Sequence, residues 1–346
     1  MNERIKVKIS SNSHGWSFLR QTPESKGIWG NYQFYTDDNT EEFDWWVIID
    51  GIPREQTIKC YPENTILITG EPPSIKKYNK DFTKQFNTII TTQEGLDNKN
   101  IFKFQLLPWY IGAHFDLKNN KLGPFTKSYD ELKRLTDISK TKLISVISSS
   151  KTTTRGHRKR LKFIKILKDH FKEKLDVLGS GINMISDKWD GIAPYRYHVV
   201  IENNVYKNYW TEKLADSLLA ESYPFYFGCP NIDDYFSPNT IVKIDINKPF
   251  EAILAIENAI QNDYYRKFHK EISEAKKQIL DRYQIFPRLC EVMNTLNRDN
   301  AHSSKVRVTI KPEITRGASI ISRISSKLFK KRYSKLASTV KVDAGR

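Results

Sequence analysis

The stretch from residue 201 to residue 230, IENNVYKNYWTEKLADSLLAESYPFYFGCP, holds the residues whose types and spacing best suit chemistry. Its pattern predicts a strand, a polar loop, a helix starting at Thr211 and a second strand. Thr211 is a suitable N-cap, and Glu212 and Lys213 follow in the first turn. A helix start offers unpaired N–H groups and partial positive charge, so it suits a diphosphate, to which Lys213 adds a full charge. In the alternative, Thr211 and Glu212 only cap the helix and Lys213 is solvated.

Cysteine is rare in the chain and follows no metal-binding pattern. Cys60, Cys229 and Cys290 are too few and too far apart for a disulfide framework, and no CxxC or Cys/His spacing indicates zinc. Three scattered cysteines are typical of a protein in a reducing compartment.

Short β-branched runs alternate with turn-rich stretches in the first 140 residues. Residues 45–50 (WWVIID), 65–69 (TILIT) and 87–91 (NTIIT) are predicted strands. Continuous apolar runs of this length are typical of strands buried on both faces. They predict an α/β layer.

A second unit of the same kind starts near Lys142. Its predicted elements are strands at 143–147, 175–178, 197–201 and 223–227, a helix carrying Phe163, Ile164, Leu167 and Phe171 on one face, a helix at 211–221, and helices over 250–296. This βαβ order predicts a parallel sheet covered by helices. Two such layers in tandem predict two facing Rossmann-like domains, with a ligand in the cleft at the carboxyl ends of the strands.

The order E-N-x5-Y-x-T-E-K resembles the donor-site signature of glycosyltransferase family 10, the α1,3/4-fucosyltransferase family, in its bacterial type. It is formed here by Glu202, Asn203, Tyr209, Thr211, Glu212 and Lys213. Residues 214–238 also resemble the sequence that follows this signature, and the resemblance extends from about residue 146 to 245. It implies the GT-B architecture, with an N-terminal acceptor domain at 1–141 and a C-terminal domain at 142–300 that binds GDP-fucose.

The resemblance also implies roles for individual residues of the signature. Lys213 would hold the diphosphate, and Glu212 would contact the ribose, or the fucose near its anomeric centre. Asn203 and Tyr209 would line the same pocket.

An arginine at the start of the first helix of the donor domain is a further family feature. Arg160 fits this position by its spacing to Phe163 and Leu167, although Arg155 and Arg158 are close enough to take its place. Arginine suits a bidentate grip on phosphate. In the alternative, the run is a solvated basic helix start.

Glu71, in Thr69-Gly70-Glu71, resembles the glutamate that acts as general base in the family. A carboxylate at the end of a strand can reach an acceptor hydroxyl across the cleft. The alternative is a surface residue before the Pro72-Pro73 turn.

Aromatic residues in LPWYIGAHFD suggest a platform for the acceptor sugar. Trp109, Tyr110 and His114 form this cluster, which in the alternative is simply part of the core. His157, in the basic loop, could touch phosphate.

The reaction implied by the resemblance is a single displacement with inversion. Glu71 takes the proton of a glycan hydroxyl, by family default the 3-OH of GlcNAc or glucose, while the diphosphate leaves. No Asp-x-Asp pair occurs to hold Mg²⁺ or Mn²⁺, so we expect no cofactor and assign charge neutralisation to basic side chains.

The positive charge is concentrated at the end of the chain. Residues 301–346 hold 12 Lys/Arg and 2 Asp/Glu, a net +10 of the total +16. Within residues 315–336, isoleucines and a leucine fall on one helical face and basic residues on the other, which predicts an amphipathic helix on an anionic membrane. In the alternative, this tail is disordered. The N-terminus lacks an apolar h-region and no apolar run reaches membrane-spanning length, so we expect a cytoplasmic protein, peripheral on the inner face of the plasma membrane.

Two other functions fit part of the sequence. A GT-B transferase with another nucleotide sugar would need the same phosphate contacts. A basic nucleic-acid-binding protein would explain the charge of +16, but the chain shows no helix-turn-helix, RRM or zinc-finger pattern. We therefore expect no nucleic acid partner.

Overall fold

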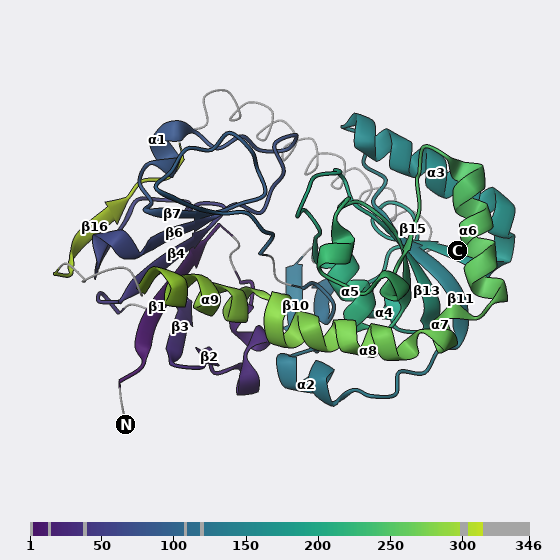
Figure 1. Cartoon of the computed structure of the whole chain (residues 1–346), viewed down its shortest axis with the longest axis horizontal. Helices are drawn as coiled ribbons and strands as arrows, with labels where there is room; N and C mark the ends of the chain where they lie inside the picture. Colours follow the sequence, from purple (N-terminus) through teal and green to yellow (C-terminus); the bar gives the residue numbers. More distant parts are fainter. Residues whose placement is uncertain are drawn as a thin grey trace, which may run out of the picture.

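The computed structural model describes residues 3–313, except for 13–14, 37–39, 107–108, 118–120 and 298–303. In this part of the chain two α/β layers lie side by side, each built on its own sheet (Figure 1). The amphipathic tail helix predicted at 315–336 lies outside the described residues.

The first sheet has seven strands, and all neighbouring pairs are parallel except the antiparallel pair at one edge. In spatial order the strands are β2 (Ile28–Trp29), β3 (Tyr32–Thr36), β1 (Ile5–Ser11), β4 (Trp45–Ile49), β6 (Thr65–Ile68), β7 (Thr88–Ile90) and β8 (Asn100–Phe102).

Strand β4 shows why its sequence is apolar throughout. Successive side chains of a strand point to opposite faces of the sheet. Trp45, Val47 and Ile49 therefore enter the core on one face, whereas Trp46 and Ile48 enter the core on the other. Both faces of the first sheet are covered, as the continuous apolar run predicts.

The second sheet has five strands, all parallel to their neighbours. In spatial order they are β12 (Leu175–Leu178), β11 (Lys142–Ile147), β13 (Tyr195–Ile201), β14 (Tyr223–Phe227) and β15 (Val242–Lys243). Two small antiparallel pairs complete the strands described: β9 (Ala113–Asp116) with β10 (Lys121–Phe125), and β5 (Gln56–Cys60) with β16 (Val306–Ile310).

Most of the helices surround the second sheet. The helices are α1 (Lys80–Thr83), α2 (Tyr129–Arg134), α3 (Arg155–Phe171), α4 (Lys188–Ile192), α5 (Glu212–Leu219), α6 (Pro249–Gln261), α7 (Tyr264–Lys267), α8 (His269–Gln278) and α9 (Ile285–Asn297). Short 3-10 turns lie at Phe18–Gln21, Pro23–Ser25, Pro62–Asn64, Lys172–Lys174, Ile232–Asp234 and Pro238–Thr240.

Helices α8 and α9 form a nearly continuous run that crosses from the second layer to the first (Figure 1). A π-helical turn, Ile279–Tyr283, joins them. Side chains of α8 lie in the core of the second layer, including Ile272 and Ala275. Those of α9, including Phe286, lie in the core on one face of the first sheet.

Packing crosses the domain boundaries that we expected at 141/142 and 300/301. Trp109 and Leu132 lie before residue 142 but belong to the core of the second layer. Helix α9 lies before residue 300 but covers the first sheet, and β16, from the start of the predicted tail, pairs with β5. Sequence periodicity identifies the apolar face of a helix but not the surface on which that face packs. The packing of these segments across the expected boundaries was therefore not predicted.

The predicted fold class, α/β with two Rossmann-like layers, is confirmed. Every strand predicted in the sequence is present within two residues of its expected ends. Strands β1, β2, β3, β5 and β8 of the first layer were not predicted.

The position of α9 can be tested with two phenylalanines in different helices. Phe286 in α9 is 0% exposed, whereas Phe250 in α6 is 77% exposed. We expect Phe286→Ala to lower the free energy of unfolding by about 3–5 kcal/mol, because it leaves a cavity in the core. Phe250→Ala should change it by less than about 0.5 kcal/mol. Urea unfolding measures both, and equal small effects would contradict the packing of α9.

Candidate active site

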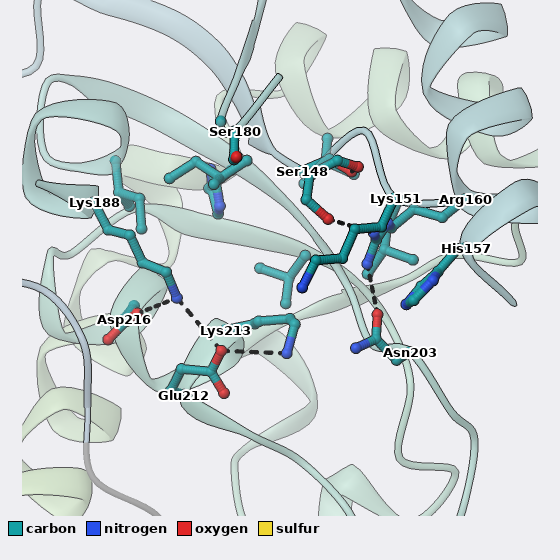
Figure 2. Close-up of a pocket in the computed structure, with 18 of the residues that line it drawn as sticks. Ser148, Lys151, His157, Arg160, Ser180, Lys188, Asn203, Glu212, Lys213 and Asp216 are labelled. Atoms are coloured by element: carbon teal, nitrogen blue, oxygen red, sulfur yellow. Dashed lines mark hydrogen bonds and ion pairs between the residues drawn. The ribbon is translucent and has the colours of Figure 1, made fainter. Parts of the chain in front are cut away.

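A pocket of about 430 Å³ lies at the carboxyl ends of strands β11, β12 and β13 and extends to the loop after β6 (Figure 2). Ser148 follows β11, Ser180 follows β12 and Asn203 follows β13, while Glu71 comes from the first layer. The carboxyl end of a parallel sheet is where ligands bind in open α/β folds.

Five of the six residues that we predicted for the site line this pocket: Glu71, Arg160, Asn203, Glu212 and Lys213. The sixth, Tyr209, is buried in the loop before α5 and is not part of the pocket lining. The structure therefore brings the carboxylate of the first layer and the cations of the second to one cavity.

Thr211 caps α5, as predicted, but the start of this helix already has an anion of its own. The buried carboxylate of Glu202 accepts hydrogen bonds from the backbone N–H of Thr211 at 2.8 Å and from its hydroxyl at 2.8 and 2.9 Å. The Thr211 hydroxyl in turn accepts the N–H of Lys213 at 3.3 Å. Our expectation that this helix start is open to a diphosphate is therefore only partly met, because Glu202 binds the N–H of the cap residue and the Thr211 hydroxyl binds that of Lys213.

Lys213 is also surrounded by carboxylates. Its ammonium lies 3.3 Å from Glu212 Oε1 and 3.5 Å from Glu202 Oε2. Although burial alone would lower the pKa of Lys213, Glu212 and Glu202 raise it, so this lysine stays charged. An anionic ligand would meet a cation that is already shared between two acids.

Arg160 is the better-placed cation. Its side chain is buried, with Nη1 donating to Asn203 Oδ1 at 2.5 Å and Nη2 donating to Ser149 Oγ at 3.4 Å. No carboxylate among the described residues lies within 4.0 Å of this guanidinium, and its buried Nε has no hydrogen-bond partner there. A buried cation without an ionic partner is a natural receptor for an anion.

The geometry distinguishes Arg160 from its neighbours. Arg155 and Arg158 are exposed and do not line the pocket. Gly156 allows the start of α3 to lie close to the loop that follows β13. A Cβ at this position would lie 2.9 Å from the carbonyl oxygen of Asn203 in that loop. His157 lines the pocket, but burial and then Arg160 lower its pKa, which favours the neutral form.

Glu71 lies on a loop that Asp50 holds in place. Asp50 Oδ1 accepts the N–H of Gly70 at 2.7 Å and the hydroxyl of Tyr78, and Gln93 donates to the carbonyl oxygen of Glu71 at 2.6 Å. Although Glu71 is an exposed residue, desolvation by neighbouring atoms and then the charge of Asp50 raise its pKa. A carboxylate with a raised pKa is suited to accept a proton.

Lys188 and Asp216 also line the pocket, and neither was predicted. Lys188, the first residue of α4, lies 3.0 Å from Asp216 Oδ2 and 3.4 Å from Glu212 Oε1. Asp216 could have been found from its spacing, because it follows Glu212 by four residues and lies on the same face of the predicted helix. Lys188 offered no comparable signal.

The predicted aromatic platform does not line this pocket. Trp109 is buried in the core of the second layer, as the alternative interpretation of this cluster expected. Tyr110 is partly exposed, with its ring 4.9 Å from the ammonium of Lys188. His114 is partly buried in β9, away from the pocket lining.

The described residues include no group of three or more His, Cys, Asp or Glu side chains suited to a metal ion. A search of the same residues finds no helix with the length and apolar character needed to span a membrane.

Comparison with known proteins gives a family and several similar structures. The profile described as "Glycosyltransferase family 10 (fucosyltransferase) C-term" matches residues 138–311. An α1,3-fucosyltransferase crystallised with GDP-fucose is 18% identical, with a TM-score of 0.45 over 87% of this chain and 92% of that one. A glycosyltransferase from Rickettsia africae ESF-5 is 9% identical, with a TM-score of 0.43 over 86% of this chain and 99% of that one.

The family match covers half of the chain and includes the whole second sheet and the helices around the pocket. It agrees with the E-N-x5-Y-x-T-E-K signature, and it is a match to an enzyme family and not to a nucleic-acid-binding one. The chain belongs to glycosyltransferase family 10, the fucosyltransferase family.

Proposed function

We propose that this enzyme transfers L-fucose from GDP-fucose to a glycan hydroxyl with inversion at the anomeric carbon. The proposed acceptor is the 3-hydroxyl of a GlcNAc or glucose unit in a surface or lipid-linked glycan. The observation that carries the proposal is the shared pocket of Glu71, from the first layer, and Arg160 and Lys213, from the second. The first layer would then hold the acceptor and the second layer the donor.

In the proposed reaction the acceptor oxygen attacks the anomeric carbon as the bond from this carbon to the diphosphate oxygen breaks. Glu71 accepts the acceptor proton, and GDP leaves with the electrons of the broken bond. Glu212 contacts the ribose or the fucose, and Asn203 lines the same pocket beside Arg160. Tyr209 supports the loop that carries Asn203 and the start of α5.

Negative charge develops on the leaving diphosphate, and the pocket has cations to meet it. Lys151, Arg160, Lys188 and Lys213 line it together with three carboxylates. Figure 2 shows Lys151, Lys188 and Lys213 extending toward the same space from different elements. We propose that Arg160 and Lys213 bind the diphosphate without a metal ion, each contributing about 3 kcal/mol, as donors in oxyanion holes do.

The donor can be identified by thermal unfolding in the presence of nucleotides. We expect GDP and GDP-fucose at a hundredfold excess over Kd to stabilise the protein by about 2.7 kcal/mol, whereas UDP and dTDP at equal concentration should not. Stabilisation by UDP or dTDP alone would favour a transferase with another nucleotide sugar.

The same measurement tests Arg160. We expect Arg160→Met to remove most of the stabilisation by GDP, because a charged hydrogen bond of about 1.5–3 kcal/mol is lost. Arg155→Met, at the exposed start of the same helix, is the matched control and should respond to GDP like the wild type. Equal responses in the two variants would assign the diphosphate to another cation.

The pKa of Glu71, the proposed base, predicts how the reaction rate depends on pH. The base must be ionised, and its pKa is raised, so kcat/KM should fall with decreasing pH at a value above the ordinary range of glutamate. Asp50→Asn removes a like charge, lowers the pKa of Glu71 and should move this acid limb to lower pH. Glu71→Gln should lower kcat by about 100-fold or more with GDP binding intact. A Gln variant that retains full activity would exclude Glu71 as the base.

We also propose that the basic tail binds an anionic membrane on the cytoplasmic side. The support is the charge of +10 and the amphipathic pattern of residues 315–336. Because β16 pairs with β5, truncation should begin after residue 314 so that this pairing is kept. We expect the truncated protein to lose binding to phosphatidylserine vesicles while GDP still stabilises it. Sedimentation with vesicles measures the loss, and unchanged binding would refute the proposal.

A further inference from the structure

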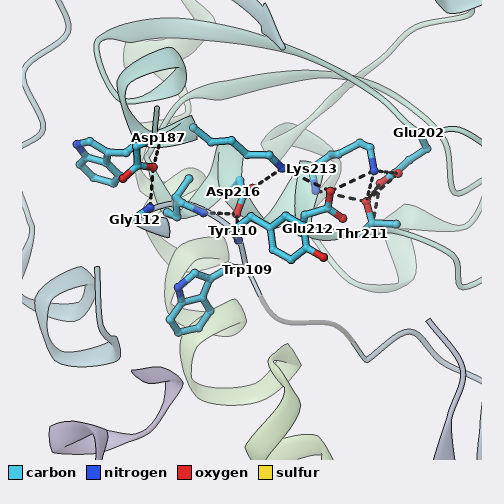
Figure 3. Close-up of polar contacts among 12 residues, drawn as sticks. Trp109, Tyr110, Gly112, Asp187, Glu202, Thr211, Glu212, Lys213 and Asp216 are labelled. Carbon is cyan, nitrogen blue, oxygen red and sulfur yellow. Dashed lines mark hydrogen bonds and ion pairs between the residues drawn. The ribbon is translucent and has the colours of Figure 1, made fainter. Parts of the chain in front are cut away.

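Five charged side chains of alternating sign form a continuous row, and all of them except the buried Glu202 line the pocket. Figure 3 labels four of the five, Glu202, Lys213, Glu212 and Asp216. The row runs Glu202, Lys213, Glu212, Lys188, Asp216, with closest N–O separations of 3.5, 3.3, 3.4 and 3.0 Å in that order. Glu212, the proposed donor contact, lies in the middle with a lysine on each side. Its orientation therefore depends on what holds these two lysines.

Asp216 is the fixed end of this row. It is 0% exposed, and its two oxygens have separate partners. Oδ1 accepts the backbone N–H groups of Tyr110 at 2.8 Å and Ile111 at 3.1 Å, whereas Oδ2 accepts from Lys188 at 3.0 Å. Because the backbone determines the position of Oδ1, it also determines where Oδ2 can hold the lysine.

The segment 109–112 that holds Asp216 is itself fixed from its other side. The buried guanidinium of Arg20 donates to the carbonyl oxygens of Trp109 at 2.7 Å and Ile111 at 2.9 Å. A third hydrogen bond, at 2.6 Å, joins Arg20 to the carbonyl oxygen of Lys127. Two N–H groups of this segment thus face Asp216, while two of its carbonyl groups accept from Arg20.

The same segment also positions the start of α4, where Lys188 lies. Gly112 N–H donates to Asp187 Oδ1 at 2.8 Å, and the same oxygen caps α4 by accepting the N–H of Trp189 at 2.8 Å. Lys188 is therefore held at both ends, its backbone by the cap at Asp187 and its ammonium by Asp216. Both restraints originate in one short segment that connects the two layers.

We propose that Lys188 and Asp216 are positioning residues: Lys188 holds the carboxylate of Glu212 ionised and in a single orientation toward the donor, and Asp216 holds Lys188 in place. This inference rests on the proposed function, in which Glu212 contacts the donor sugar nucleotide. It adds two residues to the site that touch the donor only through Glu212. The side chain of Lys188 has several rotatable bonds, so it can fix the orientation of Glu212 only if its ammonium is held in place. Asp216 holds this ammonium.

The electrostatics of Glu212 agree with this role. Although its burial would raise the pKa, Lys213 and then Lys188 lower the pKa of Glu212 to about 2. Without Lys188, only Lys213 would remain, and Lys213 is shared with Glu202. Removal of Lys188 should therefore raise the pKa of Glu212. Neutralising Asp216 removes a negative charge near Glu212, so it should not raise this pKa.

The test uses the full chain with Lys188→Met, Lys188→Arg and Asp216→Asn. Asparagine retains Oδ1 for the two N–H groups but presents an NH₂ group to Lys188 in place of Oδ2, so it breaks only the contact with the lysine. The exposed pair Lys142–Asp176, at 3.0 Å, provides the matched controls Lys142→Met and Asp176→Asn. Unfolding temperatures of all variants report any general loss of structure.

We expect Lys188→Met and Asp216→Asn to lower kcat for fucosyl transfer by about 100-fold, as misplacement of a reacting group does, with KM for GDP-fucose within about threefold of wild type. Lys188→Arg should keep kcat closer to that of the wild type than Lys188→Met does, and both controls should keep the wild-type kcat. Wild-type kcat in Lys188→Met would overturn the proposal.

A second measurement does not depend on turnover, so it tests the proposal even if the enzyme does not use GDP-fucose. Failure to use GDP-fucose would refute the proposed function instead. The ¹³C signal of the Glu212 carboxyl should stay at its ionised position in the wild type down to about pH 4, where an unperturbed glutamate is half protonated. In Lys188→Met the same signal should titrate at higher pH. Identical titration curves for the two proteins would show that Lys188 does not keep Glu212 ionised.

Discussion

The rest of the site depends on the contacts of the buried Glu202 carboxylate with Thr211 and Lys213. A carboxylate without solvent is unfavourable unless hydrogen bonds and an opposite charge compensate it, and Thr211 and Lys213 provide both. These contacts join the end of β13 to the start of α5 and fix the direction in which Lys213 and Glu212 extend. They also mean that Glu202 already neutralises part of the positive charge at this helix start, which is why we propose that Arg160 binds a ligand anion together with Lys213.

Two kinds of site residue could be predicted from sequence: residues within one continuous motif, and residues at the end of a predicted strand. Glu212, Lys213 and Asn203 are close in the chain, and the end of a strand placed Glu71 in the cleft. Lys188 could not be predicted, because its partners lie 24 and 28 residues away and are reached only through the tertiary fold. The role of Glu202 was equally hidden, because a glutamate in a sequence motif does not show whether it faces a ligand or a helix cap.

The fold was predictable where strands are buried on both faces, as in β4, because only such strands give unbroken apolar runs. Strand β1 was missed even though it lies inside the first sheet, since Lys6 and Lys8 alternate with its apolar residues. The destination of α9 could not be inferred at all. Its pattern requires an apolar surface, and the sequence contains two sheets that could provide one.

The return of α9 to the first sheet has a consequence for protein synthesis. Strand β7 ends at Ile90, but the helix that covers its sheet starts at Ile285. At translation rates of about 5–20 residues per second, roughly 10–40 s pass between the emergence of these two segments from the ribosome. During this interval one face of the first sheet lacks the helix that covers it. The nascent chain therefore leaves an apolar face of the first sheet uncovered until α9 emerges, and β16 pairs with β5 only after that.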